Sequence, residues 1–241
     1  MSTRLIEILI NSIPKILLPG LMYTIPLTLV SFALGFVIAV IVAIMRVANV
    51  RILSPIGRFY VWVFRGTPLL VQLFIIFYGL PGIGINIDAV PSAIIAFSLN
   101  VGAYASETIR GSILAIPKSQ TEGALACGLT LRQTMAYIIL PQAIKNCIPA
   151  LFNTFISLVK DTSLAANITI TEMFMATQRI VAVTYEPLAL YIEVAFVYLI
   201  FCTALSGLQK KVEKHLGKYK SENAKTGIGK GNENDKAKQP A

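Results

Sequence analysis

The chain alternates between long apolar runs and short polar loops, a pattern that predicts helices crossing a lipid bilayer. A bilayer core needs about 20 mostly apolar residues in a helix. Five runs meet or approach that length, so we expect an all-α polytopic membrane protein. The first run is too long for a removable signal peptide and has no A-x-A-like exit, so it reads as a retained span. The predicted spans lie near 20–45, between Arg65 and Asp88, between Asp88 and Glu107, at 146–159, and at about 187–208.

A polar stretch at residues 119–141 separates the third and fourth runs and carries two helix-start signals. Ser119 stands three residues before Glu122, and Thr130 stands three before Gln133. Both pairs fit the capping box, in which a hydroxyl and a Glu or Gln side chain satisfy free backbone N–H groups. The stretch therefore predicts two short helices in series.

The turn and the end of this stretch are also marked by residue type. Gly128 stands between the two predicted helices, where a left-handed backbone favours glycine. We expect Pro141 to end the second helix, because proline lacks an N–H and clashes with the preceding turn. The result is a helix–turn–helix finger suited to docking into a groove on another protein. The alternative is a surface loop folded onto the spans.

Composition agrees with a membrane protein. Charged residues make up 14% and mean hydropathy is +0.70, whereas soluble domains carry about 25% charged residues. The three cysteines are scattered, so neither a disulfide frame nor a metal site is expected. The chain has no G-x-x-x-x-G-K-[ST], H-E-x-x-H or G-x-S-x-G pattern. We therefore expect a protein that is not an enzyme, with no cofactor and no nucleic-acid partner.

The distribution of basic residues predicts the orientation. Loops rich in Lys and Arg stay on the cytoplasmic side. The loop after the first span holds four arginines and no acid, and the finger region is also basic, whereas the loop after the second span offers only Asp88. We expect a multi-pass protein of the bacterial cell membrane with its N-terminus outside. The finger and the C-terminus are expected in the cytoplasm.

The last 25 residues differ from the rest. Residues 217–241 are lysine-rich and lack apolar periodicity, which is typical of a disordered end. We therefore divide the chain into a transmembrane domain at 1–216 and a basic cytoplasmic tail at 217–241. The tail is either simply solvated or attracted to anionic lipid headgroups.

Neutral polar groups near the second span are candidates for a substrate path. Gly66, Thr67 and Pro68 predict either a broken helix, whose free backbone groups meet a zwitterion, or a simple helix start with Pro near its first position. Gln72 and Asn100 are either hydrogen-bond glue between helices or substrate contacts.

Charged groups near the later spans add further candidates. A charge in hydrocarbon costs about 2.5–3.5 kcal/mol on insertion scales and usually faces the protein interior. Lys160, Asp161, Thr162 and Ser163 are either a polar lining of the path or a terminus with an adjacent ion pair. Glu193 either lines the pathway or lies in the interfacial first turn of the fifth span.

Four segments resemble those of a known family. Glu122, Ala124, Gly128, Ile138, Leu140 and Pro141 match the EAA loop of ABC importer permeases, E-A-A-x3-G-x9-I-x-L-P, with Gly123 in place of the first Ala. Residues 64–81, 99–111 and 157–165 resemble other hallmark segments of the polar amino-acid permeases. The resemblance covers roughly residues 15–215. Within the family the chain is most similar to the cystine-transporting branch.

This resemblance implies a function. It implies a type I ABC importer permease that imports a polar amino acid, with two permease subunits (a homodimer), two cytoplasmic ATPases and an extracytoplasmic substrate-binding protein. Glu122 would meet an arginine of the ATPase, and Ala124 and Ala126 would keep the contact face low. The expected coupling residues are Glu122, Gly123, Ala124, Gly128, Leu140 and Pro141.

Other functions stay open from the sequence. The substrate is cystine, or arginine, glutamine or histidine. A proton- or sodium-coupled carrier would explain the spans but not a docking finger. A channel or a regulatory membrane subunit would also lack ATP-binding motifs.

Overall fold

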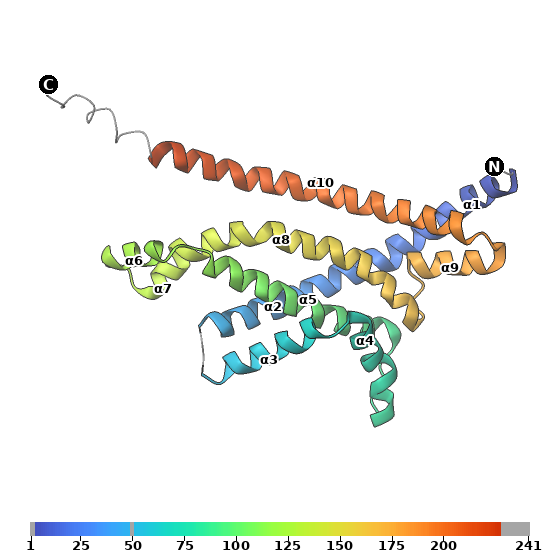
Figure 1. The fold of residues 1–241 in the computed structure, drawn as a ribbon, viewed down its shortest axis with the longest axis horizontal. Helices are drawn as coiled ribbons and strands as arrows, with labels where there is room; N and C mark the ends of the chain where they lie inside the picture. The colour runs from blue at the N-terminus through green and yellow to red at the C-terminus, as the bar shows by residue number, and fades with distance from the viewer. Residues whose placement is uncertain (1–2, 49–50, 228–241) are drawn as a thin grey trace, which may run out of the picture.

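The structure is a computed structural model that describes residues 3–48 and 51–227, with side chains up to residue 215. In this part every regular element is a helix (Figure 1). Four helices there are long and apolar enough to cross a membrane, and a fifth span is formed if two helices that meet at 104° count as one. The all-α, five-span prediction is therefore confirmed.

The elements follow one another with short connections. In chain order they are α1 (Thr3–Pro19), η1 (Gly20–Thr24), α2 (Ile25–Val47), α3 (Leu53–Gly66), α4 (Leu69–Phe74), η2 (Ile75–Gly79), η3 (Leu80–Ile83), α5 (Ala89–Leu114), α6 (Lys118–Ala126), α7 (Leu131–Thr134), η4 (Met135–Ile139), α8 (Leu140–Asp161), η5 (Thr162–Ile168), α9 (Met173–Thr184) and α10 (Pro187–Gly227).

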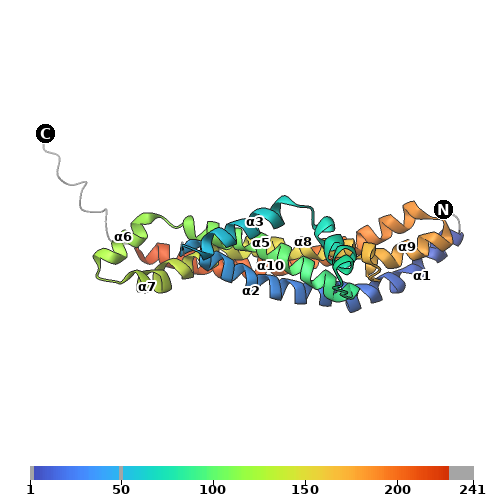
Figure 2. The same ribbon diagram turned by 90° about the horizontal axis from the view of Figure 1, so that it is seen from below.

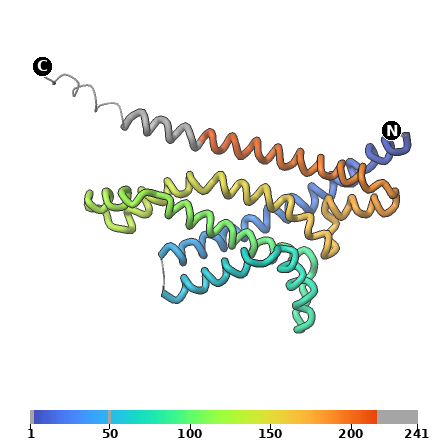
Figure 3. Tube along the Cα trace, viewed as in Figure 1, coloured from blue at the N-terminus to red at the C-terminus, as the bar shows by residue number. Residues whose placement is uncertain are grey.

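The bundle is elongated. The finger of α6 and α7 lies at one end, and the N-terminus and α9 lie at the other (Figures 1 and 2). Helix α10 runs beside α8 along much of the length, and its later turns approach the finger end (Figure 3). Residues 228–241 of the predicted tail lie outside the described residues, and the domain boundary at 217 stays a prediction.

The first span is longer than its apolar run. α1, η1 and α2 form one helical path of 45 residues from Thr3 to Val47, whereas the apolar pattern placed the start near residue 20. The charges in α1 interrupt the apolar run but not the helix, because α1 packs on α9 and α10 through one face. The Ser12 hydroxyl donates to the Glu193 carboxylate at 2.5 Å, which ties α1 to α10.

Three prolines are accommodated by π-helical turns. η1, η2 and η4 each end two residues before a proline, and the residue just before each proline bonds to the carbonyl five residues back. The wider turn leaves room for the proline ring that would clash in a regular α-helix. Pro141 therefore does not end its helix, contrary to the prediction. The helical path runs unbroken from Leu131 to Ile168, so the fourth span is also longer than 146–159.

The core is a close contact between α2 and α5. A Cβ at Gly35 would lie 2.8 Å from Val101 and 2.9 Å from the Ser98 carbonyl oxygen, so only glycine permits this approach. Around this contact lies a buried cluster that includes Leu73, Phe97 and Leu158. α5 and its neighbours therefore form the rigid centre on which the other helices pack.

A charge cluster extends the third span beyond the predicted limit at Glu107. α5 continues to Leu114 because Glu107 is paired on both sides. It accepts hydrogen bonds from Arg46 of α2 and, at 2.8 Å, from Arg110 of its own helix. Pairing of this kind lowers the cost of a charge inside a helical bundle.

Candidate functional site

The second span is broken at Thr67 and Pro68. α3 and α4 meet there at 104°, and Thr67 has an extended backbone with φ −120° and ψ 146°. Proline disfavours a helical conformation in the residue before it, which explains why the helix breaks at this point. Of the two alternatives at 66–68, the broken helix is the one observed.

Two amide side chains satisfy the carbonyl groups that the break leaves free. The Gln72 amide donates to the Phe64 carbonyl at 2.9 Å and to the Thr67 carbonyl at 3.1 Å. The Asn100 amide of α5 donates to the Gln72 side-chain oxygen at 3.1 Å. Helix ends leave their last carbonyl groups without partners. Gln72 and Asn100 therefore link the broken span to α5 by hydrogen bonds. This is the first of the two alternatives given for them, hydrogen bonding between helices.

A cavity of about 420 Å³ lies beside the break, between α3–α4, α5 and α8. It brings together Thr67, Pro68, Asn100 and Asp161 of the predicted set. Asn100 thus both forms a hydrogen bond between helices and lines the cavity. The lining residues are Thr67, Pro68, Leu69, Asn100, Val101, Tyr104, Asn153, Thr154, Ser157, Leu158 and Asp161.

Three lining residues on α8, Asn153, Thr154 and Ser157, were not predicted from the sequence. Asn153, Ser157 and Asp161 are spaced four residues apart, so they form one stripe on the helix. Polar residues at this spacing inside an apolar span are the signal that could have identified them. The fourth span is predicted from an apolar run that ends before Lys160, and that criterion takes no account of the spacing of polar residues within the run.

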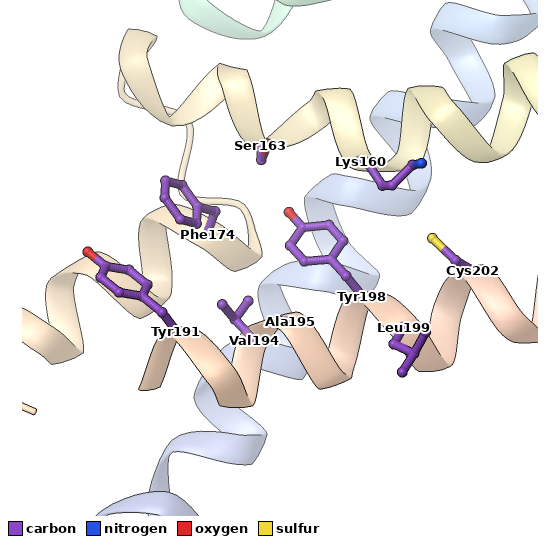
Figure 4. A pocket seen from close by; sticks show the side chains of 9 residues that line it. All are labelled: Lys160, Ser163, Phe174, Tyr191, Val194, Ala195, Tyr198, Leu199 and Cys202. Carbon is purple, nitrogen blue, oxygen red and sulfur yellow. The ribbon is translucent and has the colours of Figure 1, made fainter. Parts of the chain in front are cut away.

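A second cavity, of about 610 Å³, lies between the end of α8, α9 and α10 (Figure 4). Lys160 and Ser163 line it together with three aromatic rings and Cys202. Adjacent residues Lys160 and Asp161 therefore line different cavities, and neither belongs to the ion pairs found in the described residues. The complete lining is Lys160, Ser163, Phe174, Tyr191, Val194, Ala195, Tyr198, Leu199 and Cys202.

Gly66 and Thr162 line neither cavity. Gly66 is the last residue of α3. The Thr162 hydroxyl is buried and donates to the Val159 carbonyl at 2.7 Å. The predicted set is thus split into two cavity groups and three structural positions, Gly66, Gln72 and Thr162.

A buried carboxylate supports the wall of the second cavity. Glu172 is fully buried and accepts hydrogen bonds from the backbone N–H groups of Phe174 at 2.8 Å and Met175 at 2.7 Å, which caps α9. The Tyr198 hydroxyl also donates to it at 2.9 Å. Burial raises the pKa of the Glu172 carboxyl, although these hydrogen bonds act in the opposite direction.

The finger has the predicted turn and one of the two predicted capping boxes. Thr130 and Gln133 form the reciprocal box. Ser119 and Glu122 do not, because α6 starts directly after Pro117 and places Ser119 inside the helix. Gly128 has φ +85°. Its N–H bonds to the Leu125 carbonyl and that of Leu129 to the Ala124 carbonyl, the pattern of a Schellman motif.

The finger exposes part of the predicted coupling set. Glu122 and Gly123 are exposed in the middle of α6, and Gly128 is exposed at the turn. Ala124 is only 5% exposed, so it packs inside the finger. The expectation was that its small side chain would form part of the surface that contacts the ATPase. α6 lies against the η4 segment, and Leu140 and Pro141 follow at the base, both exposed.

Comparison with known proteins identifies the family. Residues 35–218 match the family of binding-protein-dependent transport system inner membrane components. The chain belongs to this family. The resemblance to the amino-acid permeases of ABC importers is confirmed, and the chain is a membrane component of such an importer, which works with an ATPase.

Several relatives cover most of the permease. The L-cystine transport system permease protein TcyB of Bacillus subtilis is 52% identical over 205 residues, which are 85% of this chain and 88% of the relative. The arginine transport system permease protein ArtQ of the same organism is 36% identical over 208 residues, covering 85% and 95%.

A solved structure supports the same assignment. A crystal structure of an amino acid ABC transporter with histidines matches with a TM-score of 0.83 and 32% identity, covering 89% of the permease and all of the matched chain. The methionine transporter MetNI, at 18% identity and TM-score 0.64, shares the fold.

Proposed function

We propose that this permease carries L-cystine across the cell membrane through the cavity beside the broken span. The observation that carries the proposal is that cavity, where the Asp161 carboxylate and the Asn100 amide lie on a polar lining between candidate spans. A carboxylate and an amide suit the ammonium group of an amino acid. The 52% identity to a cystine permease supports cystine as that amino acid.

The other end of a zwitterion needs a cation. Lys160, next to Asp161 in sequence, lines the neighbouring aromatic cavity. The carboxylate of Asp161 and the ammonium group of Lys160 thus place a negative and a positive charge in two neighbouring cavities. Asp161 binds the ammonium group and Lys160 attracts the carboxylate as the substrate passes.

The remaining parts of the importer follow from the finger and the loops. Two copies of the permease form the path, because five spans make half of one. On the cytoplasmic side of the membrane, the finger docks into the ATPase, with Glu122 and Gly123 at the contact. A substrate-binding protein delivers cystine on the outer side, where the N-terminus lies, and the basic loops support this orientation.

Uptake by the reconstituted importer tests the substrate. Vesicles that carry the permease, its ATPase and its binding protein should accumulate labelled L-cystine, and unlabelled cystine should compete better than arginine, glutamine or histidine. Better competition by one of the others assigns the site to that amino acid. Uptake driven by an ion gradient without ATP would favour a secondary carrier.

The site itself is tested by Asp161→Asn. A charged hydrogen bond is worth about 1.5–3 kcal/mol, so uptake efficiency should fall about tenfold or more. Asp88→Asn removes the same charge at the start of α5, outside the cavity lining. Equal effects of the two variants would remove Asp161 from the substrate path.

A further inference from the structure

A third cavity has a lining quite unlike the two already described. It measures about 370 Å³ and lies between α2, α8 and α10. Every residue that lines it is apolar, and Phe32 and Phe155 pack edge to face within it at 5.0 Å between ring centroids. The lining is Phe32, Ile148, Leu151, Phe152, Phe155 and Leu208. Water gains nothing in such a space, because it finds no polar partners there.

Lysines stand at one end of this apolar groove. On α10, Lys211 follows Leu208 by three residues, which places it one turn along the same face. On α8, Lys145 precedes Ile148 by three residues in the same way. Both lysines are exposed. Each lies toward the finger end of the bundle, since α8 begins beside the finger and the later turns of α10 approach it (Figure 1).

We propose that the groove binds one acyl chain of an anionic phospholipid, whose phosphate is held at Lys211 and Lys145. The apolar run of α10 ends at Leu208, so the membrane surface falls where the lysines begin. An acyl chain fills the groove while its headgroup lies at that surface. Basic residues next to a bilayer attract anionic lipids, each contributing about 1 kcal/mol.

Charge favours a lipid over a second copy of the permease as the occupant. A second copy would bring the same lysines to the rim of the groove, and like charges repel. A phospholipid brings the opposite charge together with an apolar chain. The proposal concerns the lipid boundary of the protein and does not depend on which amino acid is carried.

Fluorescence quenching by brominated lipids tests the proposal. Trp62 is the only tryptophan of the chain, so Trp62→Phe with Leu208→Trp places one reporter per permease at the groove, and the complex with Trp62→Phe alone supplies the background signal of the ATPase. The assembled permease–ATPase complex is reconstituted with lipids that carry bromine on their acyl chains, either phosphatidylglycerol or phosphatidylcholine. We expect phosphatidylglycerol to quench the reporter at a lower mole fraction.

Lysine variants locate the headgroup. Lys211→Gln should reduce the preference for phosphatidylglycerol about fivefold. Lys210→Gln is the matched control, because this exposed lysine lies two residues after Leu208, about 200° round the helix, and faces away from the groove. It should leave the preference unchanged.

Three results would overturn the site. Equal quenching by the two lipids would exclude headgroup selection. Equal loss in Lys211→Gln and Lys210→Gln would indicate general surface attraction. Protection from both lipids would show that protein covers the groove, a second copy being the first candidate. If Leu208→Trp prevents assembly with the ATPase, Phe152→Trp reports from the same groove.

Discussion

At Gly128 the backbone itself selects the residue. Its φ of +85° lies in the left-handed region, and a Cβ there would meet no other atom within 4 Å. The requirement is therefore conformational and not steric. A left-handed conformation costs an L-residue about 1–2 kcal/mol, and a β-branched one more.

Gly128→Val should therefore displace the finger and uncouple transport from ATP hydrolysis, while the protein still inserts into the membrane. Gly128→Asn is the matched control, because asparagine tolerates this conformation far better. The measurements are copurification of the ATPase and uptake of two competing amino acids. The order of preference between them should not change. Normal coupling in the valine variant would rule out the finger as the docking element.

Glu172 predicts a pH dependence of stability. Its carboxyl has a raised pKa in the folded protein because it is buried. A carboxyl of this kind contributes most below its unfolded pKa, and the contribution is lost as the pH rises through the folded pKa. In Glu172→Gln the side chain does not titrate, so the stability of wild type relative to the variant should fall as the pH rises.

Thermal unfolding of the purified complex at a series of pH values from acid to neutral measures this difference. The variant also loses one cap acceptor, which shifts its stability by a constant amount at every pH. The slope of the difference is therefore the quantity to compare. A difference that grows with pH would mean that the ionised form of Glu172 is the favoured one in the fold.

At the scale of elements, one side chain makes most of the hydrogen bonds across the break between α3 and α4. Gln72 is 6% exposed and its amide donates three hydrogen bonds across the break. Gln72→Leu keeps the approximate size but removes these hydrogen bonds and the acceptor of the Asn100 amide, each worth about 0.5–1.5 kcal/mol net. We expect lower thermal stability and slower uptake.

Gln142→Leu serves as the comparison for Gln72→Leu. The Gln142 amide donates a single hydrogen bond, to Ile138 within its own helix, and is only half-buried. Gln142→Leu should lower thermal stability and the rate of uptake less than Gln72→Leu does. A larger effect of Gln142→Leu would contradict the role given to Gln72.

The same elements show what local sequence can and cannot predict. The Thr130–Gln133 cap and the Gly128 turn were predictable because each is decided within a few residues, and the break at Thr67–Pro68 was one of two alternatives that the local sequence leaves open. The continuation through Pro141 was not, since proline alone does not reveal that the preceding turn widens. The separation of Lys160 from Asp161 depends on packing against α5 and α10, which no local pattern contains, whereas the stripe on α8 has a four-residue spacing that the sequence does show.

For the whole molecule, the orientation can be tested by labelling. A single cysteine at Asp88 should react with a membrane-impermeant thiol reagent in intact cells, and one at Gly123 should not, in a background without the three native cysteines. Inside-out vesicles should give the opposite result. Labelling at Gly123 alone in intact cells would invert the topology and place the finger outside.

The unbroken helical path from Leu131 to Ile168 joins the finger directly to the cavity proposed for the substrate, so it would act as one lever arm. At 1.5 Å per residue, Gln133 and Asp161 are about 42 Å apart along the axis. If the path pivots near the finger, a tilt of about 5° swings Asp161 sideways by about 4 Å over that length. Such a displacement exceeds the reach of a hydrogen bond. A small movement of the ATPase would thus be amplified by length alone into release of the substrate.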